Sequence, residues 1–234
     1  MMRQIVSAAC GLWFCLGAAA LAQAEDGVVV EFYTSQGCSS CPPADDFFAE
    51  LAHQPGVIAL ALHVDYWDYI GWEDTFAAAQ FTERQKNYAR AEGSTMIYTP
   101  QMIVGGALRV EGNKPEAVLA AVTQEQSLGH PVRLQIERSG SLVVIGVAAQ
   151  PPLTTGATVQ LVRYVDKATV NIERGENAGK SVDYHNIVTS WVKIADWSGT
   201  EPITLEAEAP GDDAVVVIVQ DSAMGDILAA QRLK

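Results

Sequence analysis

The feature that most constrains the fold is a cysteine pair placed between a strand-like segment and a helix-like segment. Residues 28–33 form a short β-branched and aromatic run, which is typical of a buried strand. Cys38 and Cys41 follow, and residues 42–53 then have helical character, with proline at the start and Asp45 in the first turn. Such a pair can be a structural disulfide, half of a metal site or a redox centre.

The first 24 residues are typical of a secretory signal peptide. Arg3 is their only charged residue, an apolar run covers residues 5–21, and the segment ends in the small-residue pattern Ala-Gln-Ala. An uncleaved membrane anchor is the alternative. Cleavage would leave a chain beginning at Glu25 that keeps only Cys38 and Cys41 of the four cysteines. We therefore expect a secreted, most simply periplasmic, protein in an oxidising compartment where a disulfide persists.

The charge of the chain restricts the classes of partner that it can bind. It has 28 acidic and 15 basic residues and a formal net charge of −13. So acidic a chain should repel nucleic acid and anionic lipid. After residue 21 no apolar run is long enough to span a bilayer, so we expect no stable membrane insertion once the signal peptide is removed.

The pattern of segments changes near His130-Pro131. Before it, strand-like and helix-like segments alternate in the order β-α-β-α-β-β-α, which favours a central mixed sheet flanked by helices. We therefore expect an α/β domain over residues 25–129 and a β-rich domain over residues 130–234. The expected strands of the first domain are 28–33, 57–64, 101–104 and 108–110, and its helices are 42–53, 74–91 and 115–126.

The second half consists almost entirely of strand-like and turn-like segments. Short strands separated by turns at regular intervals are typical of an antiparallel sandwich. The expected strands are 132–138, 142–148, 158–165, 168–172, 187–193, 203–209 and 214–220, with a last one at 227–232.

The position of the cysteines suits thiol–disulfide exchange. The N-terminus of a helix stabilises a thiolate at Cys38, and Cys41, one turn on, can attack a mixed disulfide formed there. We expect Cys38 to be the exposed nucleophile and Cys41 the resolving thiol. The chemistry needs no bound cofactor, because electrons pass to or from a partner, either protein thiols or disulfides or a small thiol.

The stretch "VVVEFYTSQGCSSCPPAD" resembles the active-site strand and helix start of the thioredoxin superfamily. The resemblance implies a thioredoxin-like fold for the first domain. It also implies a cis Pro100 opposite the cysteines, with the backbone around Thr99 receiving an extended substrate. Glu31 would be the buried acid that acts as a base for Cys41. Ser39-Ser40 departs from the thioredoxin pattern, so the direction of electron flow does not carry over.

A narrower resemblance covers nearly all of the chain after the signal peptide. The strings "TSQGCSSCPPAD", "HVDYWDYIGW", "YTPQM" and "ERGENAGKS" together resemble a bacterial family of secreted thioredoxin-like proteins of unknown function. The last string is not a phosphate-binding loop, because it is one residue too short and is flanked by strands. We expect it to be a polar loop, or a contact between domains.

The aromatic segment after the second expected strand is a candidate binding surface. Tyr66 and Trp67 lie there among several acidic residues. The carboxyl ends of neighbouring parallel strands meet at one edge of a sheet, so this segment should lie beside the cysteine loop. We expect it to form a wall of the substrate site; packing on the second domain or a helix is the alternative.

Three other interpretations of the cysteines stay open. A purely structural disulfide would close a very small loop and contribute only about 1–2 kcal/mol. A metal site would need more ligands, and His63 with Cys38 and Cys41 could hold Cu(I), although we predict no resident metal. A thioredoxin-like binding module without turnover is the third. The first hypothesis is an extracytoplasmic thiol–disulfide oxidoreductase.

Overall fold

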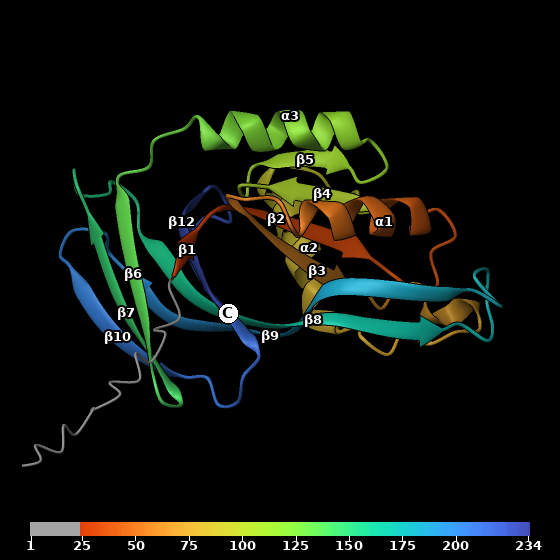
Figure 1. The fold of residues 1–234 in the computed structure, drawn as a ribbon. Coiled ribbons are helices and arrows are strands. Elements are labelled where there is room, and N and C mark those ends of the chain that lie inside the picture. The colour runs from red at the N-terminus through yellow and green to blue at the C-terminus, as the bar shows by residue number, and fades with distance from the viewer. Residues whose placement is uncertain (1–23) are drawn as a thin grey trace, which may run out of the picture.

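The computed structural model describes residues 24–234 (Figure 1). The predicted signal peptide therefore lies, apart from Ala24, outside the described residues. A nine-stranded sheet with the order β1-β12-β11-β8-β9-β3-β2-β4-β5 runs through the molecule, and a three-stranded sheet, β10-β7-β6, lies at one end. Among the described residues, no helix combines the length and the apolar character needed to cross a bilayer.

The first half folds in the expected order of strands and helices. The strands β2 and β3 are parallel, and β4 pairs antiparallel with β2 and β5. The elements are β1 Glu25–Asp26, β2 Val28–Thr34, α1 Pro42–Leu51, β3 Val57–His63, a 3-10 helix at Asp68–Ile70, α2 Ala79–Ala91, β4 Gln101–Val104, β5 Leu108–Glu111 and α3 Pro115–Gln126.

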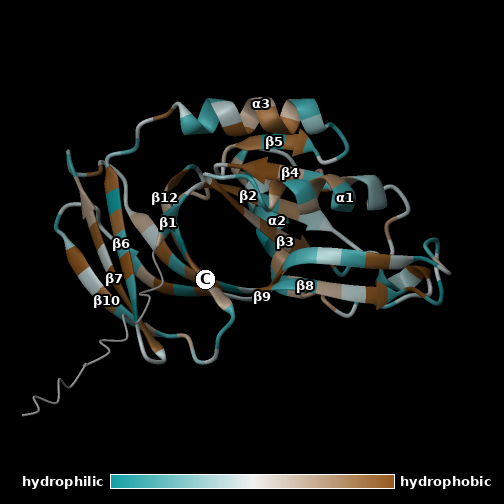
Figure 2. Cartoon of the chain, in the orientation of Figure 1, coloured by the Kyte–Doolittle hydropathy of each residue, from teal (hydrophilic) through white to brown (hydrophobic). Residues whose placement is uncertain are grey.

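Helices cover both faces of this half of the sheet, because successive strand residues point to opposite sides. Val30 and Phe32 of β2 face α1 and α3, where they pack with residues such as Phe48. Val29 and Tyr33 face α2 on the other side. The hydropathy colouring shows that the strands of this half are largely apolar, whereas its helices carry both polar and apolar residues (Figure 2).

Helix α2 begins five residues later than we predicted. The expected start was residue 74, but the helix runs from Ala79. Asp74 is instead buried, accepting hydrogen bonds from the backbone N–H groups of Gln36 and Phe76 and pairing with His63. A carboxylate held in this way fixes the turn before the helix, and periodicity alone does not detect it.

The second half is β-rich, as expected, and forms two packed layers. One layer is the three-stranded sheet and the other consists of β8, β9, β11 and β12; residues such as Ile136, Ile145, Val159 and Val217 fill the space between them. The strands are β6 Val132–Ser139, β7 Leu142–Ala149, β8 Ala157–Asn171, β9 Ser181–Trp197, β10 Ile203–Glu208, β11 Ala214–Asp221 and β12 Ile227–Leu233.

Two strands of this half are longer than predicted and join the first half. The segments expected at 158–165 and 168–172 are one strand, β8, and its partner β9 is equally extended. Their antiparallel pairing continues past the layered region, and β9 meets β3 in parallel at Ala61 and Ile187. The change of pattern near residue 130 is therefore not a break in the main sheet.

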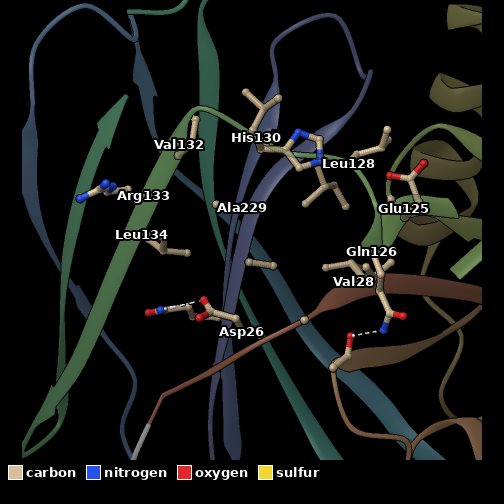
Figure 3. A pocket seen from close by; sticks show the side chains of 18 of the residues that line it. Asp26, Val28, Glu125, Gln126, Leu128, His130, Val132, Arg133, Leu134 and Ala229 are labelled. Carbon is tan, nitrogen blue, oxygen red and sulfur yellow. Dashed lines mark hydrogen bonds between the residues drawn. The ribbon is translucent and has the colours of Figure 1, made fainter. Parts of the chain in front are cut away.

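A cleft of about 640 Å³ lies where the link after α3 enters β6. Asp26, Glu125, His130 and Arg133 supply its ionisable groups, beside apolar side chains such as Leu128 (Figure 3). The cleft contains neither cysteine and none of the other site residues predicted from the sequence, so it is not part of the candidate redox site.

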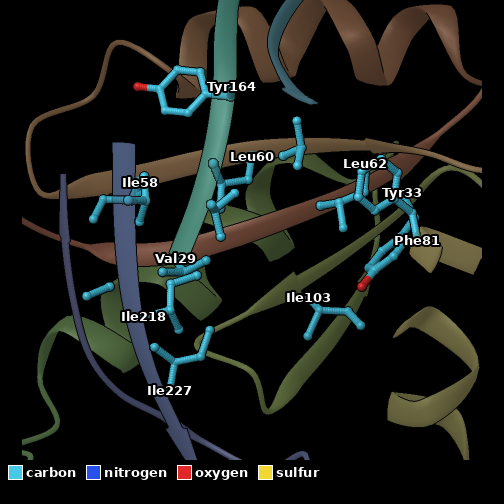
Figure 4. Close-up of a cluster of buried hydrophobic side chains, with 14 of the residues drawn as sticks. Val29, Tyr33, Ile58, Leu60, Leu62, Phe81, Ile103, Tyr164, Ile218 and Ile227 are labelled. Carbon is cyan, nitrogen blue, oxygen red and sulfur yellow. The ribbon is translucent and has the colours of Figure 1, made fainter. Parts of the chain in front are cut away.

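One apolar core is shared by both halves. It joins Val29 and Leu60 of the first half to Tyr164 of β8 and Ile218 of β11, all essentially inaccessible to solvent (Figure 4). Because apolar surface removed from water contributes about 25 cal/mol per Å², a continuous core of this kind couples the stability of the two halves.

A buried ion pair stands at the centre of this junction. Arg84 of α2 donates two hydrogen bonds, each 2.7 Å, to the two carboxylate oxygens of Glu31 on β2. The same guanidinium donates to Gln160 of β8 and Gln220 of β11, and it stacks 3.8 Å from the ring centre of Trp191 on β9. One side chain thus contacts elements from both halves.

We predict that Arg84→Met destabilises the protein by about 3–5 kcal/mol, because it leaves the Glu31 carboxylate buried without a counter-charge. Urea unfolding measures the change. The double variant Glu31→Gln with Arg84→Met should recover much of the loss. The matched control is Arg90→Met on the same helix, which breaks only an exposed pair with Glu83 and should leave the stability nearly unchanged. An equal loss of unfolding free energy in Arg84→Met and Arg90→Met would contradict the prediction.

Candidate functional site

Cys38 and Cys41 form a disulfide at the start of α1. Their sulfurs are 2.13 Å apart, and Cys41 is the N-cap residue of the helix. Both cysteines are completely buried, whereas Ser39 and Ser40 between them are exposed. The expectation that Cys38 is an exposed nucleophile is therefore wrong in this structure. Its nearest polar neighbour is the Ser40 hydroxyl, 3.4 Å from the Cys38 sulfur.

The loop before the disulfide is a tight turn at the end of β2. The Cys38 N–H donates to the Ser35 carbonyl at 3.1 Å, and the Ser35 hydroxyl accepts from the Gly37 N–H. A Cβ atom at Gly37 would lie 3.1 Å from the Cβ of Trp67. The absence of a side chain at Gly37 thus allows the aromatic segment to pack directly on the cysteine loop.

The aromatic segment lies where the sequence placed it, beside the cysteine loop. The Trp67 indole N–H donates to the Thr99 hydroxyl at 2.8 Å, and the Trp72 indole N–H donates to the side-chain oxygen of Gln36, also at 2.8 Å. Tyr66 points instead toward α2, where its hydroxyl donates to Gln85. The structure therefore brings Trp67 and Thr99 together, and it places the Tyr66 hydroxyl on Gln85, whose amide donates to the Tyr98 carbonyl beside Thr99.

The Thr99-Pro100 bond is cis, as the thioredoxin resemblance implied; a second cis bond, Gln150-Pro151, was not predicted. Thr99 and Pro100 line a cleft of about 350 Å³ that also reaches Ser40. Met96 lines the same cleft and has 69% of its surface exposed. This cleft connects the exposed part of the Cys-x-x-Cys turn with the cis-proline loop.

The tip of the β8–β9 hairpin also covers the cysteine loop. The side-chain amide of Asn177, which is buried, donates to the carbonyls of Gln36 and Cys38, each at 2.9 Å. Gly175 lies against Trp72, and Lys180 donates to the Asn177 side-chain oxygen. The segment is a loop between strands, as expected, and it also contacts the first domain, which the sequence left open as an alternative. The sequence held no signal for Asn177 in particular.

Glu31 does not approach the cysteines. It projects from the face of β2 that packs on α2, whereas α1 covers the opposite face. Each of its carboxylate oxygens already accepts two hydrogen bonds, from Arg84 and from the hydroxyls of Tyr33 and Tyr88. This placement does not support the predicted role of Glu31 as the base for Cys41.

His63 lies at the end of β3, in register with Thr34 of β2, and is fully buried. Its Nδ1 is 2.8 Å from Asp74. Burial alone would raise the pKa of Asp74, but His63 and two backbone N–H groups outweigh it and bring the pKa below its usual value. Within residues 24–234, no three His, Cys, Asp or Glu side chains are grouped so as to hold a metal, including Cys38, Cys41 and His63.

Asp45 is a site residue that sequence reasoning missed. We assigned it only a favourable position at the start of a helix. In the structure it is buried, and one of its carboxyl oxygens accepts a 2.9 Å hydrogen bond from Thr34 at the end of β2. Its spacing, four residues after Cys41, was the available signal, since residues four apart share a helix face.

Comparison with known proteins places the chain in a family. A family model described as "Protein of unknown function (DUF1223)" matches residues 29–220. The chain belongs to this family. A crystal structure of a protein from Agrobacterium tumefaciens is similar, with 30% sequence identity, a TM-score of 0.74, and coverage of 88% of this chain and 93% of that one.

A second solved structure shows a similar fold without close sequence similarity. HBP35 of Porphyromonas gingivalis has 14% identity and a TM-score of 0.64, covering 89% of this chain and 74% of that chain. No curated protein matches the chain. The expectation of a family of unknown function is confirmed, and the site of this DUF1223 member has to be interpreted from its own geometry.

We predict that Asn177→Ala in this DUF1223 protein exposes the disulfide. Two hydrogen bonds to the cysteine loop are lost, each worth about 0.5–1.5 kcal/mol, so reduction by dithiothreitol should accelerate on the order of tenfold. Thiol counting after acid quenching measures the rate. The neighbouring Glu176→Ala, which removes an exposed side chain from the same tip, is the control. An unchanged rate in Asn177→Ala would show that the tip does not limit access.

Proposed function

We propose that this protein is an extracytoplasmic thiol–disulfide oxidoreductase with a thioredoxin-like α/β domain, and that Cys38 and Cys41 are its redox pair. The observation that carries the proposal is the disulfide at the N-terminus of α1, whose intervening residue Ser40 lines a cleft together with Thr99 and Pro100. A bond used only as a staple would need no such cleft.

The arrangement of the first half supports a thioredoxin-like fold. A parallel β2–β3 pair is extended by the antiparallel strands β4 and β5, with α1 and α3 on one face and α2 on the other. The order β2-α1-β3-α2-β4-β5-α3 matches the one expected from the resemblance. The cysteines then occupy the carboxyl end of the sheet, where open α/β folds bind their ligands.

We assign the exchange to Cys38, whose buried sulfur lies 3.4 Å from the hydroxyl of Ser40, a residue that lines the cleft. A partner thiolate attacks the Cys38 sulfur, forms a mixed disulfide with it, and breaks its bond to Cys41, which takes the electron pair. A second thiol of the partner, as its thiolate, then attacks the mixed disulfide. The partner leaves as a disulfide, and Cys38 and Cys41 remain as two reduced thiols. The same steps in reverse reduce a partner disulfide.

The cleft supplies the binding surface for the partner. Pro100 and Thr99 form its floor, Trp67 holds the Thr99 hydroxyl, and Met96 offers an exposed apolar side chain near the rim. An extended peptide that carries a cysteine or disulfide fits such a surface, with its backbone along Thr99. Tyr66 supports this wall from behind through Gln85.

The location of the protein follows from the predicted signal peptide at residues 1–24, and an oxidising compartment keeps the disulfide formed. A second candidate function, a binding module without turnover, is favoured by one observation: both sulfurs are buried. The two functions differ in whether a reductant can pass electrons through the pair.

We predict that the protein accelerates the reduction of insulin by dithiothreitol, and that Cys38→Ser abolishes the acceleration, because the nucleophile is lost. Cys41→Ser should instead accumulate a mixed disulfide at Cys38, detectable by mass spectrometry. All assays use the chain that begins at Glu25, in which Cys38 and Cys41 are the two remaining cysteines. Equal rates with wild type and Cys38→Ser would contradict the oxidoreductase and favour the binding module.

A further inference from the structure

The cleft between the two halves of the chain contains a buried acid. Its volume of about 640 Å³ lies within the range of about 300–1,000 Å³ that is usual for small-molecule sites, which often form between packed units. Glu125 of α3 lines this cleft, and only 6% of its surface is exposed. A carboxyl so deeply buried needs a partner, and the nature of the missing partner indicates what the cleft can bind.

Glu125 lies on the apolar face of α3. The other buried residues of the helix, Val118, Ala121 and Val122, precede it at helical spacing, so the pattern calls for an apolar side chain at position 125. Glu125 is also in the last turn of the helix, where the negative end of the helix dipole disfavours an anion and favours a cation. The acid therefore stands where both burial and the helix oppose its charge.

Neighbouring residues do not compensate for this position. Among the described residues no group donates a hydrogen bond to the Glu125 carboxyl, and the charges that act on it are those of Asp226 and His130. Burial raises the pKa of Glu125, the charge of Asp226 adds to the rise, and His130 opposes it. Residues that break local rules without compensation within the fold are typical of functional sites.

The turn between β4 and β5 fixes the Glu125 carboxyl at the junction of the two halves. A Cβ atom at Gly105 would overlap this carboxyl, so the acid rests directly against the glycine. The Gly105 N–H donates to the Val29 carbonyl of β2 at 2.9 Å, and the Gly105 carbonyl accepts from the Ile227 N–H of β12 at 2.8 Å. Backbone from both halves thus supports the acid.

The rest of the cleft is largely apolar. Val28 of β2, Leu134 of β6 and Leu228 of β12 line it, and Glu125 and Leu134 lie on opposite sides of it (Figure 3). Arg133 projects from the other face of β6, as alternation along a strand requires, and is exposed, so it does not neutralise Glu125 (Figure 3). A ligand for this cleft needs a cationic end and an apolar body.

We propose that the cleft binds a small organic cation, a primary amine with an apolar body, at a site separate from the disulfide. The ammonium group pairs with Glu125 and supplies the hydrogen-bond donors and the counter-charge that this carboxyl lacks. Asp226 and the C-terminal end of α3 add to the attraction for a cation. The apolar body of the amine extends along Val28 and Leu134 and removes their side chains from water.

The test compares hexylammonium, hexanol and hexanoate, three probes of one chain length that differ in charge. Each is titrated into ¹⁵N-labelled chain beginning at Glu25, and the amide chemical shifts are followed by NMR. Hexylammonium should shift the amides of Gly105, Glu125 and Ile227 and bind about tenfold or more tighter than hexanol, because hydrogen bonds to charged groups are the stronger ones. Hexanoate should bind more weakly still.

Glu125→Gln keeps the shape of the side chain but removes its charge. Its affinity for hexylammonium should fall about tenfold or more, while its affinity for hexanol stays the same. Without ligand, its unfolding temperature should rise, because a buried charge without a partner is gone. Glu116→Gln, which neutralises an exposed acid in the first turn of the same helix, should bind hexylammonium as wild type does.

Three results would overturn the proposal. They are the absence of shifts in the cleft at millimolar hexylammonium, equal binding of hexanol and hexylammonium by wild type, and unchanged binding of hexylammonium by Glu125→Gln. Equal binding of the first two probes would mean that Glu125 does not attract the cation. The comparison of probes uses wild type alone, so it decides the matter even if Glu125→Gln does not fold.

Discussion

The Glu31–Arg84 pair is the interaction around which the two halves of the chain are assembled. A guanidinium can be buried only if its donors are matched, and Arg84 finds acceptors on β2, β8 and β11 and an aromatic face on β9. This requirement fixes α2 against the strands of the second half. The β-rich part is therefore needed by the α/β part, because Gln160, Gln220 and Trp191 supply contacts to the buried guanidinium of Arg84.

The same junction determines how the candidate site is built. Since β8 and β9 are held against the first half at Arg84 and at the β3–β9 pairing, their hairpin extends along it to the cysteine loop. Its tip then caps the carbonyls of Gln36 and Cys38 through Asn177, while Tyr184 of β9 packs its ring edge-on against His63. Thus every site residue predicted from the sequence lies in the first half, but the second half contributes side chains that cover the site.

The sequence predicts local elements better than it predicts contacts between distant segments. The period of apolar residues identified nearly every strand and helix, and the cis Pro100 and the proximity of Trp67 to the cysteine loop followed from the resemblance and from strand direction. The start of α2 was missed because Asp74 is held by Gln36 and His63, partners far along the chain. The cover over Cys38 was missed for the same reason, since a polar loop containing Asn177 looks like any exposed turn.

Glu31 and Asp45 show why residue type and position in sequence do not fix a chemical role. Both are buried acids flanking the cysteines in sequence, and the resemblance favoured the one in the strand. Alternation along β2 places Glu31 on the face of α2, where Arg84 and the hydroxyls of two tyrosines occupy both of its carboxylate oxygens. Asp45 shares the helix of Cys41 and has one acceptor unused, so burial favours its protonated form. The two acids therefore differ in the hydrogen-bond partners that the fold offers them, and their places in the sequence do not reveal this difference.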